Sequence, residues 1–248
     1  PSLGWRLTGE LLRRLLGRRV QRPMVDARKL YTEGEREQIR QALQKAESTT
    51  TGEIVCAVAS ESGRYDRAEA MIGFACGLVL LGLLHSFHGG GAGSFGAAQP
   101  LSLGWEVGVL CAGFLGGNLL SSWFPTLRTP LVPRQEMEEE TVRAAWAVFC
   151  SKKLASTVQR GGLLIYFSLF ERRVVVLADQ GALEALGQPG VEQVRDAAVS
   201  ALRQGKPLQA MLDCVGRAGQ LLGEKLPCSQ GGGDNELADE LIILHPRP

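Results

Sequence analysis

The sequence predicts one water-soluble α/β domain that is interrupted by a two-helix transmembrane hairpin at residues 66–124. Two apolar segments, 66–87 and 105–124, are each about 20 residues long, the length that crosses roughly 30 Å of hydrocarbon. Amphipathic helical patterns and β-rich runs stand on both sides of these segments. Once the membrane segments are subtracted, the remaining residues suffice for about one domain of ordinary size.

Charge and cysteine usage exclude several classes of protein. The 27 basic and 26 acidic side chains nearly balance, whereas nucleic-acid-binding domains carry a strong basic excess, so nucleic acid is not an expected partner. No two of the six cysteines stand at CxxC spacing, which argues against a zinc site. Disulfide frameworks belong to small secreted domains, and the cysteines are therefore expected to be reduced thiols.

Residues 1–22 are predicted to form an amphipathic interfacial helix. Trp5 and four leucines cluster on one side of a helical wheel, and arginines that include Arg13 and Arg14 lie opposite. One interpretation places this helix in the lipid headgroup layer, with its arginines toward anionic lipid. The other interpretation packs it on a partner protein or on the soluble domain.

The soluble domain is predicted from residues 23–65 and 125–228. In its first part, Thr32 and Glu35 have the spacing of a capping box at the start of a helix. Residues 53–60 are rich in β-formers and are predicted to form a buried strand.

The part of the domain after the hairpin contains a second set of elements. Two strands, 163–169 and 173–177, have a short connection, which predicts an antiparallel hairpin. The other expected elements are helices at about 135–154, 190–204 and 207–225, followed by a Gly-rich linker with an acidic and apolar tail at 229–248.

Tryptophans and glycines support the transmembrane interpretation. Trp105 and Trp123 stand at the two ends of the second apolar segment, where amphipathic rings favour the membrane interface. Small-xxx-small pairs permit close contact between helices and suit packing on other helices of a larger assembly. Four glycines form two such pairs: Gly73 with Gly77, and Gly113 with Gly117. The alternative, two buried core helices of a soluble protein, needs more surrounding chain than 248 residues provide.

The distribution of basic residues predicts the orientation of the hairpin. The loop 85–104 contains no Lys or Arg, whereas Arg64, Arg67, Arg128 and Arg134 flank the hairpin on its other side. The positive-inside rule then places the soluble domain in the cytoplasm. We therefore expect a multi-pass protein of the inner (cytoplasmic) membrane, with the lipid bilayer as one partner.

Three segments resemble the TPM domain family, in particular its membrane-bound bacterial branch. They are TGEIV at 51–55, GGLLIYFSLFERRVVVLADQG at 161–181, and NELADEL at 235–241, which is similar to the family's closing NELPDEL motif. Their order and spacing agree with that branch over about residues 25–244, with a transmembrane hairpin between the first two segments. The resemblance implies a small mixed sheet of about four strands flanked by helices on both faces.

The chain departs from the family where relatives carry an acid or a His. The family's Asp-Asp-x-Gly start corresponds to VDAR at 25–28, which keeps only Asp26, and LAST at 154–157 lacks the His of many relatives. Some members of the wider family are assigned metal binding or phosphatase activity, and its namesakes include thylakoid-lumen proteins tied to photosystem II repair. The missing acid and His argue against metal binding and phosphatase activity in this chain.

Asp26 and Asp179 are the candidate metal ligands. Asp179 follows the last predicted strand, in ADQG at 178–181. Two carboxylates without a third oxygen ligand make a poor cation site, so no cofactor is expected, and a divalent cation is the alternative to loop and helix-cap roles. The run ERR at 171–173 is interpreted as a solvated hairpin turn rather than a phosphate clamp.

His85 and His88 stand three residues apart at the end of the first apolar segment. On one helical face they are candidate ligands of a metal or of a chlorophyll-type pigment. Alternatively, these histidines contact lipid headgroups or loop backbone.

These observations favour a membrane-anchored, non-catalytic accessory, assembly or maintenance subunit of a larger membrane protein complex. By analogy with the family that the chain resembles, this complex is expected to be photosynthetic or respiratory. The alternative is a metal-dependent phosphatase at the membrane surface. The enzyme requires Asp26 and Asp179 to lie within about 8 Å of each other if they are to share one ion.

Overall fold

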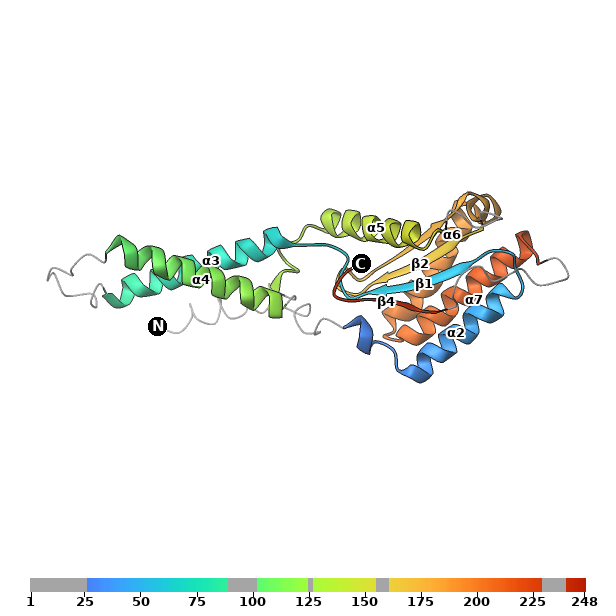
Figure 1. Ribbon diagram of the computed structural model, residues 1–248, viewed down its shortest axis with the longest axis horizontal. Coiled ribbons are helices and arrows are strands. Elements are labelled where there is room, and N and C mark those ends of the chain that lie inside the picture. The colour runs from blue at the N-terminus through green and yellow to red at the C-terminus, as the bar shows by residue number, and fades with distance from the viewer. Residues whose placement is uncertain (1–25, 89–101, 125–126, 155–160, 229–239) are drawn as a thin grey trace, which may run out of the picture. The chain divides into compact units, whose positions relative to one another are not determined.

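The described residues fall into two compact units. The computed structural model describes residues 26–88, 102–124, 127–154, 161–228 and 240–248 (Figure 1). One unit is Arg64–Pro133, and the other combines Val25–Gly63 with Arg134–Pro248. The predicted interfacial helix, with Trp5, Arg13 and Arg14, lies outside the described residues.

A mixed four-stranded sheet forms the centre of the larger unit. The strands are β1 (Ile54–Ala59), β2 (Leu163–Ser168), β3 (Arg173–Ala178) and β4 (Ile242–Leu244), in the spatial order β3-β2-β1-β4. β1 is parallel to β2 and to β4, whereas β2 and β3 form the predicted antiparallel hairpin. A mixed sheet of four strands, which the family resemblance implies, is therefore confirmed.

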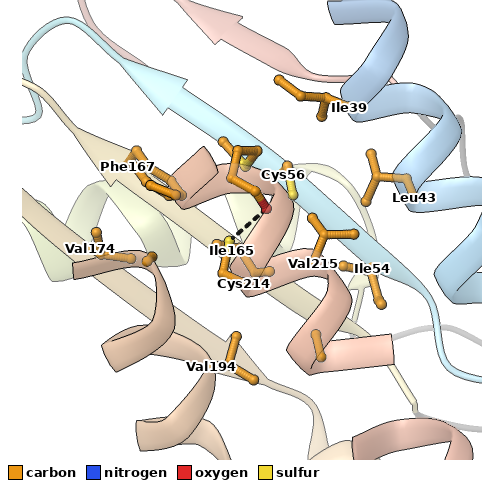
Figure 2. Packing of buried hydrophobic residues seen from close by; sticks show 14 of the residues in the cluster. Ile39, Leu43, Ile54, Cys56, Ile165, Phe167, Val174, Val194, Cys214 and Val215 are labelled. Atoms are coloured by element: carbon orange, nitrogen blue, oxygen red, sulfur yellow. Dashed lines mark hydrogen bonds between the residues drawn. The ribbon is translucent and has the colours of Figure 1, made fainter. Parts of the chain in front are cut away.

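Helices cover both faces of this sheet. The helices α2 (Glu33–Glu47), α6 (Gln180–Arg203) and α7 (Pro207–Lys225) lie on one face, and α5 (Arg134–Ser151) lies on the other (Figure 1). Figure 2 shows the core of the first face, where α2, α6 and α7 direct apolar side chains toward the strands. The labelled members are Ile39, Leu43, Ile54, Cys56, Ile165, Phe167, Val174, Val194, Cys214 and Val215.

Local sequence signals explain how two of these helices begin and bend. The predicted capping box of α2 is present, because the Glu35 N–H donates to Thr32 Oγ1 at 3.3 Å and the Thr32 N–H donates to Glu35 Oε2 at 2.8 Å. α6 starts earlier than the predicted residue 190 and is kinked at Gly187, whose φ of 64° is left-handed. A glycine tolerates this conformation without the steric cost of a Cβ, so a short first segment precedes the predicted helix.

The position of the fourth strand was not predicted, since residues 229–248 were interpreted as a linker and tail. β4 has only three residues, and its pairing with Ala57–Ala59 is parallel and far apart in sequence. A run of three apolar residues is too short for a periodicity to identify a strand.

The smaller unit is a pair of helices, α3 (Asp66–His88) and α4 (Leu103–Trp123). Both are long and apolar enough to cross a membrane, and only 11% of each apolar window is buried. Core helices of soluble proteins are mostly buried, which these helices are not. At the base of the pair, the Arg128 guanidinium, 2% exposed, contacts the Glu69 carboxylate at 2.7 Å.

The four glycines lie inside this helix pair. A Cβ on Gly113 would stand 2.6 Å from Gly77 Cα, and a Cβ on Gly117 would stand 2.8 Å from Gly73 Cα. The two small-xxx-small pairs therefore face each other and permit close contact between α3 and α4. The glycines predicted for helix packing thus lie in a helix–helix contact, while packing on helices of a partner stays a prediction.

Candidate functional site

The end of the sheet at which β1, β2 and β4 finish carries most of the buried polar side chains of the larger unit. We call it the carboxyl end and the opposite one the amino end. In α/β sheets, ligands bind outside the carboxyl ends of parallel strands. The polar groups there are therefore the candidate functional site.

Asp26 lies at the carboxyl end, before the short 3-10 helix η1 (Ala27–Lys29). Its carboxylate accepts hydrogen bonds from the Arg28 backbone N–H at 3.0 Å and from the Arg28 guanidinium at 2.8 Å. The side-chain hydrogen bond from Arg28 is the largest cause that lowers the pKa of Asp26 to about 2, against some desolvation. Asp26 is thus ionised and already paired with a cation.

Ser60, His245 and Asp26 form a constellation that resembles a catalytic triad only in its residue types. Ser60 Oγ accepts from the Ala27 N–H at 2.9 Å and lies 2.8 Å from His245 Nδ1. Asp26 Oδ1 lies 3.3 Å from the same Nδ1 atom. A triad needs the acid and the nucleophile on different ring nitrogens, and Ser60 is fully buried. The arrangement therefore holds the end of β4 against η1 rather than activating a nucleophile.

A second buried network ties the end of β2 to the segment that follows β1. Glu171 Oε1 accepts from the backbone N–H groups of Ser62, at 2.9 Å, and Gly63, at 3.3 Å. Ser168 Oγ donates to Glu171 Oε2, and Ser62 Oγ lies 2.9 Å from the Tyr166 hydroxyl. Burial is the main cause that raises the pKa of Tyr166 to about 12.

Glu171 corrects the interpretation of ERR as a solvated turn. Glu171 is only 7% exposed, although the neighbouring Arg172 is exposed. A buried carboxylate remains stable when several donors satisfy it, and the two backbone N–H groups and the Ser168 hydroxyl do so here. The carboxylate fixes residues 62 and 63, immediately before the chain leaves this unit.

Asp179 lies at the amino end, which separates it from Asp26. Its backbone N–H donates to the Gly162 carbonyl at 2.8 Å, beside the first residue of β2. Asp26 lies near Ser60, after the last residue of β1. A strand rises about 3.3 Å per residue, so a six-residue strand sets the two carboxylates at least roughly 15 Å apart.

The structure therefore does not bring the predicted metal ligands together, because both oxygens would have to lie within about 2.6 Å of one ion. Asp179 precedes α6 and makes no side-chain cap hydrogen bond. Among the described residues, no group of three or more His, Cys, Asp and Glu side chains could hold a metal ion.

The predicted interface and pigment residues lie at the ends of the helix pair. His85 Nε2 is 3.4 Å from Glu106 Oε1, across from α3 to α4, and His88 is the last residue of α3. Trp105 and Trp123 are 67% and 77% exposed at the two ends of α4. Ligation of a metal or pigment by His85 and His88 stays a prediction.

Sequence reasoning missed His245, because no local pattern marks it. The signal that identifies it is the run Ile242–Leu244. Once this run is recognised as a strand parallel to β1 with Leu244 beside Ala59, the next residues on each strand, His245 and Ser60, must be neighbours.

The comparisons with known proteins bear on the fold. No protein-family model matches the chain, and no curated protein matches its sequence. Among solved structures, the chain is similar to the NMR structure of the BA42 protein from the psychrophilic bacterium Bizionia argentinensis. The two share 16% sequence identity with a TM-score of 0.53, over 87% of this chain and 96% of that chain. This likeness supports the mixed α/β fold alone.

Proposed function

We propose that this chain is a membrane-anchored, non-catalytic accessory, assembly or maintenance subunit of a larger membrane protein complex. It belongs, in this proposal, to the membrane-bound branch of the TPM domain family, and its complex is photosynthetic or respiratory by family analogy. The observation that carries the proposal is the helix pair α3 and α4. Its four paired glycines, Gly73, Gly77, Gly113 and Gly117, face inward, and its large apolar side chains face outward.

The outward surface of the helix pair requires an apolar surrounding. The exposed side chains include Met71, Phe74, Leu78, Val79, Leu83, Leu115 and Leu119. Contact with water costs about 25 cal/mol for each Å² of apolar surface, and water-soluble monomers rarely expose contiguous apolar patches of more than a few hundred Å². A lipid bilayer removes this cost and fits the length of both helices.

The polar groups of the larger unit support a structural role. Asp26 is paired with Arg28, and the buried Glu171 is satisfied by backbone and hydroxyl donors. The phosphatase alternative needs Asp26 and Asp179 at one ion, and they lie at opposite ends of the sheet. An exposed Trp146 on the outer face of α5, 48% exposed, adds an apolar contact point for a protein partner.

Native purification tests this proposal. The tagged chain is extracted from its own membranes in mild detergent, and mass spectrometry identifies the membrane subunits that co-purify. We expect the Asp26→Ala/Asp179→Ala variant to retain these subunits and the deletion of residues 1–20 to lose part of them. Purified wild-type protein is expected to hydrolyse a phosphate ester with added divalent ions no faster than the double variant. Turnover that disappears in the double variant would sink the proposal in favour of the enzyme.

A further inference from the structure

Exposed apolar side chains mark the outer face of α5. Among the described residues of the larger unit, three large apolar side chains are exposed: Val142, Trp146 and Leu183. The first two lie on α5, which packs on the face of the sheet opposite α2, α6 and α7 (Figure 1). The helix α5 thus exposes apolar side chains in the middle of its outer face, where α2 and α7 place polar ones.

The Trp146 ring is held in place by the core beneath it. It packs edge-to-face on Phe149, with ring centroids 5.3 Å apart and an angle of 71° between the planes. Phe149 is buried in the cluster between α5 and the sheet. A Trp side chain that is already fixed loses little conformational entropy when a partner covers it, and Trp is enriched at the hot spots of protein interfaces. Trp146 is therefore suited to anchor a contact with another protein.

A stripe of exposed side chains runs along α5 with Trp146 at its centre. Residues that follow one another by three or four positions lie on one side of a helix. We call this set the α5 stripe: Glu139, Val142, Trp146, Cys150 and Lys153, the last just past the end of the helix. The stripe begins with an acid, is apolar in the middle and ends with a base, so a copy that runs antiparallel presents the reverse order.

The two charged ends of the stripe are available to a partner. Within the part of the chain that the structure describes, Glu139 has no basic partner and Lys153 has no acidic partner within ion-pair distance. Glu139 accepts a hydrogen bond from the Gln135 side-chain amide at 2.9 Å. The acids next to Glu139 are paired inside the unit: Glu138 with Arg173 at 3.1 Å, and Glu140 with Arg143 at 2.6 Å.

A two-fold axis at Trp146 matches the stripe with its own reverse. Glu139 and Lys153 lie seven residues before and after Trp146, so each Glu139 faces the partner's Lys153. Val142 and Cys150 lie four residues before and after it, so they face each other in the same way.

The other charges of α5 do not oppose this arrangement. Lys152 lies opposite the partner's Glu140, which has the opposite sign. Arg134 and Glu136 lie twelve and ten residues before Trp146, opposite positions beyond the end of the partner's α5.

We infer that the α5 stripe is the contact surface of a homodimer, in which the α5 helices of two copies pack antiparallel about a two-fold axis at Trp146. An interface of this kind must be complementary to itself, and the stripe is. Antiparallel helices pack at about 20° with axes about 8–10 Å apart, which lets the two Trp146 rings meet. The dimer does not require the proposed membrane anchoring or complex, because α5 belongs to the larger unit.

The first experiment measures the dimer dissociation constant of the full chain in mild detergent by sedimentation velocity. Trp146→Ala removes the anchor from both sides of the interface, and we expect the dissociation constant to rise at least about tenfold. The matched control Leu183→Ala removes an exposed apolar side chain on α6 and should leave the constant unchanged. Hydrogen exchange of the β1 amides checks that both variants are folded.

Reversal of the two end charges identifies the partner as a second copy. Glu139→Lys alone, or Lys153→Glu alone, places like charges opposite each other and should weaken the dimer about fivefold. The double variant Glu139→Lys/Lys153→Glu should restore the wild-type constant, because each changed residue then meets the other changed residue across the axis. A different protein keeps its own charges, so a double variant that stays weak would overturn the homodimer in favour of such a partner.

A cross-link tests the register of the two helices. Val142→Cys should form a disulfide with the partner's Cys150 when membranes that contain the full chain are oxidised with copper phenanthroline, because a disulfide needs Cα atoms about 4.4–6.8 Å apart. The band of the cross-linked dimer should disappear in Val142→Cys/Cys150→Ser. The control Ala147→Cys is exposed on another side of α5 and should give no such band.

Three results would overturn the inference. They are a chain that stays monomeric at the highest concentration measured, a dimer that Trp146→Ala does not weaken, and a cross-link that forms without Cys150.

Discussion

The close contact between α3 and α4 leads to a sharp mutational prediction at Gly113. An added Cβ there would lie 2.6 Å from Gly77 Cα and 3.0 Å from Gly77 N. Carbon atoms in favourable contact are about 3.5–4.0 Å apart, so Gly113→Ala must separate the two helices by about 1 Å. The obstacle is backbone on α3, which cannot rotate away as a side chain can.

The expected cost follows from two opposing contributions. Overpacking a close contact destabilises by about 1–3 kcal/mol, whereas Gly→Ala in a helix gains about 1 kcal/mol of helix propensity. Gly116 is a matched control on the same helix, because a Cβ there meets nothing within 4 Å. Both alanine variants gain the same propensity, so Gly113→Ala should be less stable than Gly116→Ala by about 1–3 kcal/mol.

The assay must resolve the helix pair from the α/β unit. The full chain in mild detergent is titrated with SDS, and hydrogen exchange in peptides from α3 and α4 reports the midpoint at which the pair separates. We expect a lower midpoint for Gly113→Ala and an unchanged or higher one for Gly116→Ala. Coincident midpoints would refute the assignment of Gly113 to the helix contact.

Three further predictions concern the buried carboxylate, pH and topology. Glu171→Leu leaves two backbone N–H groups and the Ser168 hydroxyl without their acceptor, which costs about 1–3 kcal/mol each. Urea denaturation should therefore show that the free energy of unfolding falls by at least about 3 kcal/mol. The control Glu184→Leu, at an exposed position, should lower it much less. The pKa of Asp26 is lowered from 3.8 to about 2, so the ionised carboxylate stabilises the fold fully above the unfolded pKa, and this stabilisation disappears as the pH falls through about 2. The difference in free energy of unfolding between wild type and Asp26→Asn should therefore shrink between pH 5 and pH 2. A difference that stays constant over this range would contradict the prediction. An impermeant thiol probe added outside should label Ser94→Cys above the wild-type blank and leave Ser229→Cys at that blank, and the reverse result would invert the orientation.

Features that depend on neighbours in sequence could be predicted, and the capping box of α2 is an example. Thr32 and Glu35 are three residues apart, so their contact requires only that a helix begins there. The β2–β3 hairpin is equally local. Composition alone likewise identified the two apolar helices.

Features that depend on the register of distant strands could not be predicted. From the sequence, Glu171 was interpreted as part of a charged turn. The backbone N–H groups that donate to its carboxylate belong to Ser62 and Gly63, which precede it by more than 100 residues. His245 and Ser60 meet only because β4 pairs with β1. The glycine pairs could be recognised as contact surfaces, but the sequence did not say that each pair would contact the other.

The placement of β1 in the sheet has a consequence for biosynthesis. β1 is translated before the helix pair, but both of its neighbours, β2 and β4, are translated after it. The sheet therefore cannot form on the ribosome until the apolar helices have emerged, and β4 arrives almost 200 residues after β1. At about 5–20 residues per second, the apolar strand Ile54–Ala59 spends roughly ten to forty seconds with at least one open edge. Translation of α3 and α4 thus precedes completion of the α/β unit, and a chain cut before Ile242 would keep one side of β1 open permanently.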